Sequence, residues 1–204
     1  MVNNVALVIA TFLQGLFRAI MIEDRYERLR QLNWWKSDLV SNAIALVAGC
    51  GALGNEVIKN LLLMGWGKII VVDFDNVEIH NLTRTILYTN RDIGYSKAIS
   101  IAKNARRINP DCRILSLHGD IRLLLSAGMI SRCDVVFGCL DNVSARLSLN
   151  TLTRQAGKPY IDGGLSIWDG AATCFWPTDD ACYACTLTDD DIKDLNLRRS
   201  CSIY

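Results

Sequence analysis

The chain has 204 residues, of which half are hydrophobic, and its 22 Lys and Arg nearly balance 21 Asp and Glu, for a formal net charge of +1. This composition indicates one globular domain, with at most a small appendage, and it excludes a general electrostatic attraction to nucleic acid. Partners must therefore be inferred from local sites.

The most hydrophobic segment covers residues 5–22 and is interrupted by Gln14, Gly15 and Arg18. It has no basic residues ahead of it and no good small-residue cleavage site, which argues against a signal peptide. A transmembrane helix needs about 20 uninterrupted apolar residues, so we interpret the segment as a helix docked on the domain or on a partner subunit. The alternative is an anchor on a membrane surface.

A charged run with a helical pattern follows at residues 23–30 and includes Arg25 and Arg28. From composition alone, such a run is typical of a solvated helix face with paired charges.

Residues 43–75 read as strand, glycine turn, helix, glycine turn and strand, with the motif Gly49-x-Gly51-x-x-Gly54 at the first turn. Gly49 permits the tight turn, Gly51 lets a phosphate approach the backbone, and Gly54 allows close packing of the helix. The helix N-terminus presents unpaired N–H groups to an anion. Asp73 ends the second strand, where it can accept hydrogen bonds from ribose hydroxyls. The pattern predicts a nucleotide-binding unit; the alternative is a tight turn without a ligand.

Polar groups crowd just after the second strand, at the edge where open α/β sheets bind ligands: Asp73, Asp75, Asn81, Arg84 and Lys97. A nicotinamide enzyme needs a largely uncharged path for hydride, whereas a triphosphate needs several cations and carboxylates that hold Mg²⁺. The cluster therefore favours ATP over NAD or FAD.

Strands and helices alternate through the rest of the chain. We expect a helix over 96–109 with Ser96 as its N-cap and a basic face toward solvent (Lys103, Arg106, Arg107), a strand over 112–117, a helix over 121–127, a strand over 134–139, a helix over 143–155 and an antiparallel strand over 170–176. The alternation predicts an α/β fold, a Rossmann-like and mostly parallel sheet flanked by helices, with antiparallel additions near the C-terminus.

Asp141 follows the strand over 134–139 and is expected opposite the glycine loop. A carboxylate there can hold Mg²⁺, or it can serve as the N-cap of the next helix, and both roles could hold.

These motifs together resemble the ubiquitin-activating superfamily, which includes the bacterial MoeB and ThiF adenylating proteins. The matching stretches are Arg25-Tyr26-x-Arg28, Gly49-x-Gly51-x-x-Gly54, Asp73-Phe74-Asp75, Asn81-Leu82-x-Arg84, Gly94-x-Ser96-Lys97, Asn109-Pro110 and Leu140-Asp141-Asn142. The resemblance runs from about Arg25 to the end of the chain.

The resemblance implies an enzyme that adenylates the C-terminal glycine of a ubiquitin-like or sulfur-carrier protein ending in Gly-Gly, with release of pyrophosphate. Asp73 resembles the ribose ligand, and Asp141 resembles the Mg²⁺ ligand. Arg28 resembles an arginine that reaches the γ-phosphate from the other subunit of a homodimer or heterodimer. The residues that resemble phosphate contacts are Asn81, Arg84 and Lys97.

Three cysteines lie in the polar C-terminal stretch: Cys182, Cys185 and Cys201. The CxxC pair would need two more ligands to hold Zn²⁺, and the family's second pair is missing, so the chain reads as truncated at its C-terminus. The alternative is a redox-active or simply reduced pair. Cys201 follows two arginines that would lower its pKa, and it lies near the family's thioester cysteine; it is either a nucleophile or an ordinary loop cysteine.

We expect an N-terminal helical segment over 1–40, an ATP-binding adenylation domain over 41–178 and an incomplete cysteine-containing loop over 179–204. The cysteines scattered through apolar strands indicate a reducing cytoplasm. The balanced charge predicts no nucleic-acid partner, and the interrupted hydrophobic segment predicts no membrane partner. Two other functions remain open: a truncated, non-catalytic partner subunit, and an NAD-dependent oxidoreductase, against which Arg84 and Lys97 argue.

Overall fold

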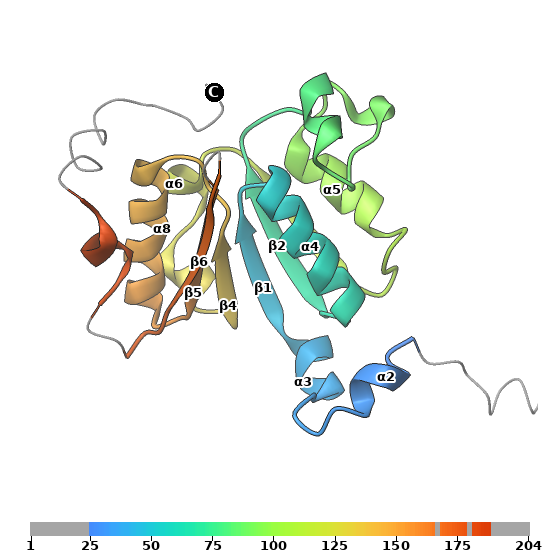
Figure 1. Ribbon diagram of the computed structural model, residues 1–204, viewed down its shortest axis with the longest axis horizontal. Coiled ribbons are helices and arrows are strands. Elements are labelled where there is room, and N and C mark those ends of the chain that lie inside the picture. The colour runs from blue at the N-terminus through green and yellow to red at the C-terminus, as the bar shows by residue number, and fades with distance from the viewer. Residues whose placement is uncertain (1–24, 166–167, 179–180, 189–204) are drawn as a thin grey trace, which may run out of the picture. The chain divides into compact units, whose positions relative to one another are not determined.

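The computed structural model describes residues 25–165, 168–178 and 181–188 (Figure 1). The chain divides into two compact units, Met1–Ser37 and Asp38–Tyr204. In the first unit, helix α2 (Glu27–Arg30) forms the end of the predicted charged helix. The hydrophobic helix expected over residues 5–22 lies outside the described residues.

The second unit holds the sheet and its helices, labelled as in Figure 1. The strands are β1 (Ile44–Ala48), β2 (Lys68–Asp73), β3 (Arg113–His118), β4 (Val135–Gly138), β5 (Tyr160–Leu165) and β6 (Gly170–Phe175). The helices are α3 (Ser37–Asn42), α4 (Ala52–Met64), α5 (Lys97–Ala105), α6 (Ile121–Leu124), α7 (Ala127–Ile130) and α8 (Val143–Ala156), with the 3-10 turns η1 (Ile79–Thr83), η2 (Asn90–Asp92) and η3 (Tyr183–Thr186).

The six strands form one sheet in the order β3-β2-β1-β4-β5-β6. The first five strands run parallel, and β6 pairs antiparallel with β5 from Tyr160 opposite Phe175 to Leu165 opposite Gly170. The predicted α/β fold with a late antiparallel addition is therefore confirmed. The strand order reverses between β1 and β4, and such a switch point is where open α/β sheets bind ligands.

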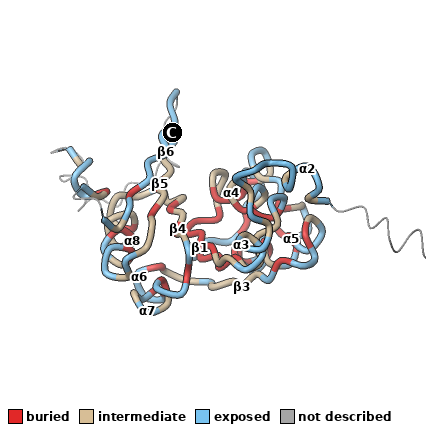
Figure 2. The backbone as a smooth tube through the Cα atoms, turned by 90° about the horizontal axis from the view of Figure 1, so that it is seen from below, coloured by how far each residue is buried: buried red, intermediate tan, exposed pale blue. Residues whose placement is uncertain are grey.

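Alternate residues of the central strands face two separate cores, as the period of a strand requires. On β1, Ala45 and Val47 pack with α4 and α5, while Leu46 and Ala48 pack with α6, α7 and α8. Figure 2 shows much of the buried chain around β1, in the middle of the sheet. Helices thus cover both faces of the sheet, which explains why the central strands β1 and β2 are nearly continuous apolar runs.

The helix predicted over 121–127 is wrong, because the structure has two short helices there. Asp120 caps α6 by accepting from the Arg122 N–H at 2.9 Å, and Leu125 then takes an extended conformation. Ser126 starts α7 by accepting from the Met129 N–H at 3.2 Å. A second capping residue inside the apolar pattern therefore divides the helix.

The helix predicted over 96–109 ends early, at Ala105. Arg107 and Ile108 make turn bonds to the carbonyls three residues before them, and the Asn109 side chain donates to the Leu62 carbonyl at 3.1 Å. Ser96 is the N-cap, as predicted, accepting from the Ile99 N–H at 3.5 Å. The predicted basic face is exposed along its whole length: Lys103, Arg106 and Arg107.

In the part of the chain that the structure describes, no helix is both long enough and apolar enough to cross a membrane. The cysteines of that same part are free thiols.

Candidate nucleotide site

The glycine loop between β1 and α4 needs its first and third glycines for space. Gly49 has a φ of +93°, and a Cβ placed on it would lie 2.2 Å from the carbonyl oxygen of Cys139. A Cβ on Gly54 would lie 2.0 Å from the carbonyl oxygen of Gly49. A Cβ on Gly51, by contrast, would meet nothing within 4 Å. Of the three glycines, only Gly51 therefore borders space that is not filled by atoms of the described residues.

Asp73 ends β2 beside this loop and is bound to it. Its carboxylate accepts from the Cys50 N–H at 2.6 Å and from the Asp75 N–H at 2.7 Å. Burial raises the pKa of Asp73, against the opposing effect of these two hydrogen bonds. Each carboxylate oxygen can accept a second hydrogen bond, so Asp73 can still receive hydroxyl donors from a ligand.

Lys97 reaches the same edge because residues 75–77 pair with residues 94–97. The Lys97 N–H donates to the Asp75 carbonyl at 2.9 Å, and the Val77 N–H donates to the Tyr95 carbonyl at 2.8 Å. This pairing places the Lys97 ammonium 2.7 Å from the Asp75 carboxylate. Since Lys97 is only 9% exposed, its positive charge is held at the site rather than spread into solvent.

Asn81 and Arg84 come from η1 and the residue that ends it. The Asn81 side-chain oxygen accepts from the Glu78 N–H at 2.9 Å, which leaves the amide N–H₂ group as a donor. Arg84 is exposed, and its guanidinium donates to the His80 carbonyl at 2.9 Å.

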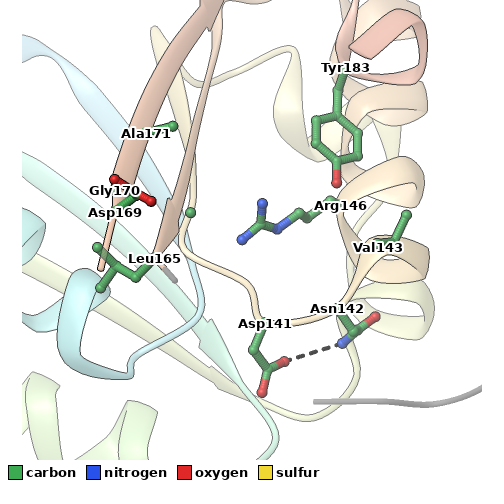
Figure 3. A pocket seen from close by; sticks show the side chains of 10 residues that line it. Asp141, Asn142, Val143, Arg146, Leu165, Asp169, Gly170, Ala171 and Tyr183 are labelled. Atoms are coloured by element: carbon green, nitrogen blue, oxygen red, sulfur yellow. Dashed lines mark hydrogen bonds between the residues drawn. The ribbon is translucent and has the colours of Figure 1, made fainter. Parts of the chain in front are cut away.

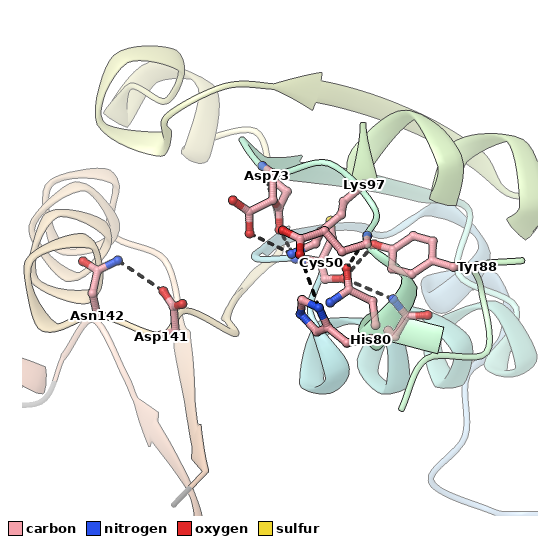
Figure 4. A network of polar contacts seen from close by, with 11 residues as sticks. Cys50, Asp73, His80, Tyr88, Lys97, Asp141 and Asn142 are labelled. Carbon is pink, nitrogen blue, oxygen red and sulfur yellow. Dashed lines mark hydrogen bonds and ion pairs between the residues drawn. The ribbon is translucent and has the colours of Figure 1, made fainter. Parts of the chain in front are cut away.

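Asp141 follows β4, on the other side of the switch point from Asp73. Figure 4 draws it with Asn142, apart from the group formed by Cys50, Asp73 and Lys97. The prediction that Asp141 caps the next helix is wrong, because Asn142 is the N-cap of α8 and accepts from the Ala145 N–H at 2.8 Å. The Asn142 amide also donates to Asp141 at 3.3 Å. Asp141 itself is exposed, so it can face a ligand.

A cavity of about 380 Å³ adjoins Asp141, between α8 and the hairpin of β5 and β6 (Figure 3). It is lined by Asp141, Asn142, Val143, Arg146, Gly164, Leu165, Asp169, Gly170, Ala171 and Tyr183. The strand side of the lining has mostly small residues, and the helix side has polar ones. The cavity therefore offers backbone and small side chains on one side and hydrogen-bonding groups on the other.

Arg146 lies at this cavity and was missed from the sequence, where it reads as a surface residue of a helix. Its guanidinium donates to the Leu140 carbonyl at 2.7 and 2.9 Å, to the Gly163 carbonyl at 3.2 Å and to the Asp162 carboxylate at 3.2 Å. Burial opposes its charge, but the Asp162 carboxylate raises the pKa of Arg146. Arg146 thereby fixes the residue directly before Asp141 to strand β5.

Asp92 organises the segment between η1 and α5. Its carboxylate accepts from the Thr89 N–H at 2.8 Å, the Thr89 hydroxyl at 2.7 Å and the Asn104 amide at 2.8 Å. Lys103 lies 3.8 Å from it. Burial acts to raise the pKa of Asp92, but the hydrogen bonds from Thr89 and Asn104 outweigh it, and the pKa is lowered.

We expect Asp92→Ala to reduce the free energy of unfolding at neutral pH by about 1–3 kcal/mol, because buried donors lose their acceptor. A carboxyl group with a lowered pKa in the folded state stabilises the protein above its unfolded pKa of about 4, and that contribution is lost as the pH falls through the folded pKa. Urea unfolding at neutral pH and at about pH 3 measures both effects. The exposed Asp111→Ala is the control, and an equal loss of stability on acidification in Asp92→Ala and the wild type would contradict the assignment.

The remaining predicted residues are Arg28, Cys182, Cys185 and Cys201. Arg28 is an exposed residue of α2, in the first unit. Cys182 receives a hydrogen bond from the Asn150 amide at 3.4 Å, and the Cys185 N–H donates to the Cys182 carbonyl. No group of three or more His, Cys, Asp or Glu suited to a metal occurs among the described residues, so these alone do not complete a zinc site. Cys201 lies outside the described residues.

The strand order and the glycine loop at its reversal define a Rossmann-like α/β protein with a candidate nucleotide site at the switch point. The chain belongs to the ThiF family, whose pattern matches residues 26–203. This confirms the resemblance seen in the sequence motifs.

Curated relatives carry related names. Adenylyltransferase and sulfurtransferase MOCS3 of Xenopus laevis is 34% identical over 146 residues, 72% of this chain and 32% of the relative. SUMO-activating enzyme subunit 2 of Dictyostelium discoideum is 30% identical over 166 residues, 80% of this chain and 25% of the relative. Sulfur carrier protein adenylyltransferase of Thermus thermophilus is 31% identical over 155 residues, 74% of this chain and 57% of the relative. The chain thus spans between a quarter and somewhat more than half of the length of these relatives.

Proposed function

We propose that this chain carries the ATP site of an adenylyltransferase that activates the C-terminal glycine of a ubiquitin-like or sulfur-carrier protein. The observation that carries the proposal is the placement of a glycine loop, a buried lysine and an exposed aspartate around one switch point. Two relatives named as adenylyltransferases, one of them a sulfur carrier protein adenylyltransferase, support the reaction class. A third relative, named as a subunit of a SUMO-activating enzyme, agrees with it.

In this proposal the nucleotide lies across the glycine loop. Asp73 accepts hydrogen bonds from the ribose, and the open space over Gly51 receives the phosphates. The Lys97 ammonium, which lies 2.7 Å from the Asp75 carboxylate, would also form an ion pair with a phosphate oxygen. Asn81 and Arg84 would supply further donors to the phosphates from η1 and its end.

Asp141 is the residue that would hold Mg²⁺. Mg²⁺ is usually bound through one or two carboxylates, phosphate oxygens and waters, so one exposed carboxylate beside the proposed phosphates fits the ion. When bound, the ion would neutralise negative charge on the phosphates. No dedicated cage of protein ligands is required for this role.

The cavity beside Asp141 is the proposed site for the tail of the carrier protein. Its lining by Gly164, Gly170 and Ala171 leaves room for a backbone with small side chains, as a Gly-Gly ending would present. Arg146 donates two hydrogen bonds to the Leu140 carbonyl, which fixes the position of the neighbouring Asp141 relative to the cavity wall.

The reaction needs no nucleophile from the protein. A carboxylate oxygen of the carrier attacks the α-phosphorus, a new O–P bond forms, and the bond to the β-phosphate oxygen breaks as pyrophosphate leaves. The chain's contribution is in-line positioning and stabilisation of charge by Lys97 and Arg84.

Arg28 from a second, identical or related subunit would reach the γ-phosphate, and the Cys201 thiol would displace AMP from the activated glycine to form a thioester. Zinc at Cys182 and Cys185 would need two ligands from outside the described residues. The functional parts would then be residues 1–40, 41–178 and 179–204, as expected from the sequence.

ATP–pyrophosphate exchange in the presence of carrier proteins ending in Gly-Gly tests the function. We expect exchange that depends on a carrier and falls about 100-fold in Arg84→Ala, because a cation that stabilises developing charge is lost. Arg91→Ala, an exposed arginine in the same segment, is the matched control and should keep full exchange. ATP binding without exchange by any carrier would instead favour a non-catalytic partner subunit.

A further inference from the structure

The peptide group between Cys50 and Gly51 is held from the protein interior by two side chains. The Cys50 carbonyl accepts from the Tyr88 hydroxyl at 2.7 Å and from the Asn55 amide at 3.1 Å. Cys50 and Asn55 are completely buried, and Tyr88 is 5% exposed. Two donors thus occupy both lone pairs of one backbone carbonyl.

Fixing this carbonyl also fixes the direction of the next N–H group. In a trans peptide the C=O and the following N–H point in opposite directions, and the described residues contain no cis peptide. With the Cys50 carbonyl directed to the buried donors, the Gly51 N–H is directed to the opposite side. No hydrogen bond from the Gly51 N–H is found within residues 25–165, 168–178 and 181–188.

The loop needs such a restraint because of its own sequence. Gly51 lacks a Cβ and therefore places little steric limit on rotation of the peptide before it. The space beside it is open within 4 Å. Without a bond to the carbonyl, this peptide could turn its oxygen, a negative dipole end, toward a bound phosphate.

The residue before Tyr88 is held by hydrogen bonds to side chains of α4 and α5. The Leu87 N–H donates to the Asn55 side chain at 2.9 Å, and the Leu87 carbonyl accepts from the Asn104 amide at 2.9 Å. Burial raises the pKa of Tyr88, so its hydroxyl keeps its proton and remains a donor. Figure 4 shows Tyr88 reaching toward Cys50.

We infer that Tyr88 is a positioning residue for the phosphates of the nucleotide: with Asn55 it pins the Cys50 carbonyl inward and so aims the Gly51 N–H at a phosphate oxygen. The inference rests on the proposed function of the site as an ATP site. Tyr88 touches no phosphate and acts through the peptide group alone. Its effect is therefore specific for ligands that carry phosphates.

The test compares binding of Mg²⁺–ATP and of adenosine to the full chain and to Tyr88→Phe. This change removes one oxygen and keeps the aromatic ring in the core. We expect the dissociation constant for ATP to rise about tenfold and that for adenosine to change less than about twofold, because adenosine does not contact the Gly51 N–H. Tyr95→Phe, an exposed tyrosine in the same segment, is the control and should change neither.

Asn55→Ala provides a second variant, since it removes the other bond to the same carbonyl, and each protein is titrated below its own melting midpoint. The same preference for loss of ATP over adenosine is expected. Equal weakening of both ligands, or unchanged ATP affinity in Tyr88→Phe, would overturn the positioning role while leaving the ATP site in place. A wild-type chain that binds no ATP would overturn the proposed function and this inference together.

Discussion

Gly49→Ala is expected to destabilise the fold and to abolish nucleotide binding. A left-handed φ of +93° costs a residue with a Cβ about 1–2 kcal/mol, and the contact at 2.2 Å from the Cys139 carbonyl adds a cost typical of overpacking, about 1–3 kcal/mol. We therefore expect a loss of about 3 kcal/mol in the free energy of unfolding, measured by urea denaturation. The loop can accommodate the alanine side chain only by moving away from Cys139.

Gly51→Ala is the matched comparison within the same loop. Its φ of −70° and ψ of −157° are accessible to alanine, and the added Cβ meets no protein atom within 4 Å. We expect a change in stability within about 0.5 kcal/mol, as for substitutions that disturb no packing. Affinity for ATP should still fall, because the Cβ occupies the space proposed for phosphate. Gly51→Ala that binds ATP as tightly as the wild type would remove Gly51 from the phosphate site.

Asp141→Ala is expected to reduce ATP–pyrophosphate exchange by at least about 100-fold while leaving the protein folded. Asp141 is exposed and is not the N-cap of α8, so its side chain does little for stability. Its loss would remove the proposed carboxylate ligand of Mg²⁺ beside the phosphates. Exchange is measured at saturating Mg²⁺ and carrier, with the melting temperature as a check of folding.

Asp169→Ala is the control for Asp141, because Asp169 lines the same cavity and is also exposed. Exchange should be retained in Asp169→Ala, because we expect the loss in Asp141→Ala to come from the missing Mg²⁺ ligand and not from a lower negative charge at the cavity. Retained exchange in Asp141→Ala would exclude Asp141 from the mechanism. A similar loss in both variants would assign the effect to the cavity rather than to a metal ligand.

The sequence predicts the fold well because its signals are local. Apolar runs mark the strands, and the glycine motif marks the turn from β1 to α4. Asp73 falls at the end of β2, where the pattern places it. The break between α6 and α7 was missed because Ser126 looks like any polar residue in an amphipathic helix until its side chain is seen to accept from Met129.

The parts of the site that sequence reasoning missed depend on tertiary contacts. Tyr88 lies in an irregular segment with no periodicity, and its partner Cys50 is 38 positions away along the chain. Arg146 reads as a solvent-facing helix residue, yet its partners come from the segment after β4 and from β5. Asp162 likewise looks like a strand residue without a role until Arg146 and the Tyr160 hydroxyl, at 2.6 Å, are found beside it. Side chains that act by holding backbone carry no motif of their own.

The close approach of Gly49 to the Cys139 carbonyl joins the loop after β1 to the segment after β4. The two segments pack against each other in the folded chain, so both have lost conformational entropy before a ligand binds. Ligands arriving on the two sides of the switch point then meet surfaces with little freedom left to lose, and less of their interaction free energy offsets ordering of the protein. The conformational entropy of ordering both halves of the site is therefore lost during folding rather than during ligand binding.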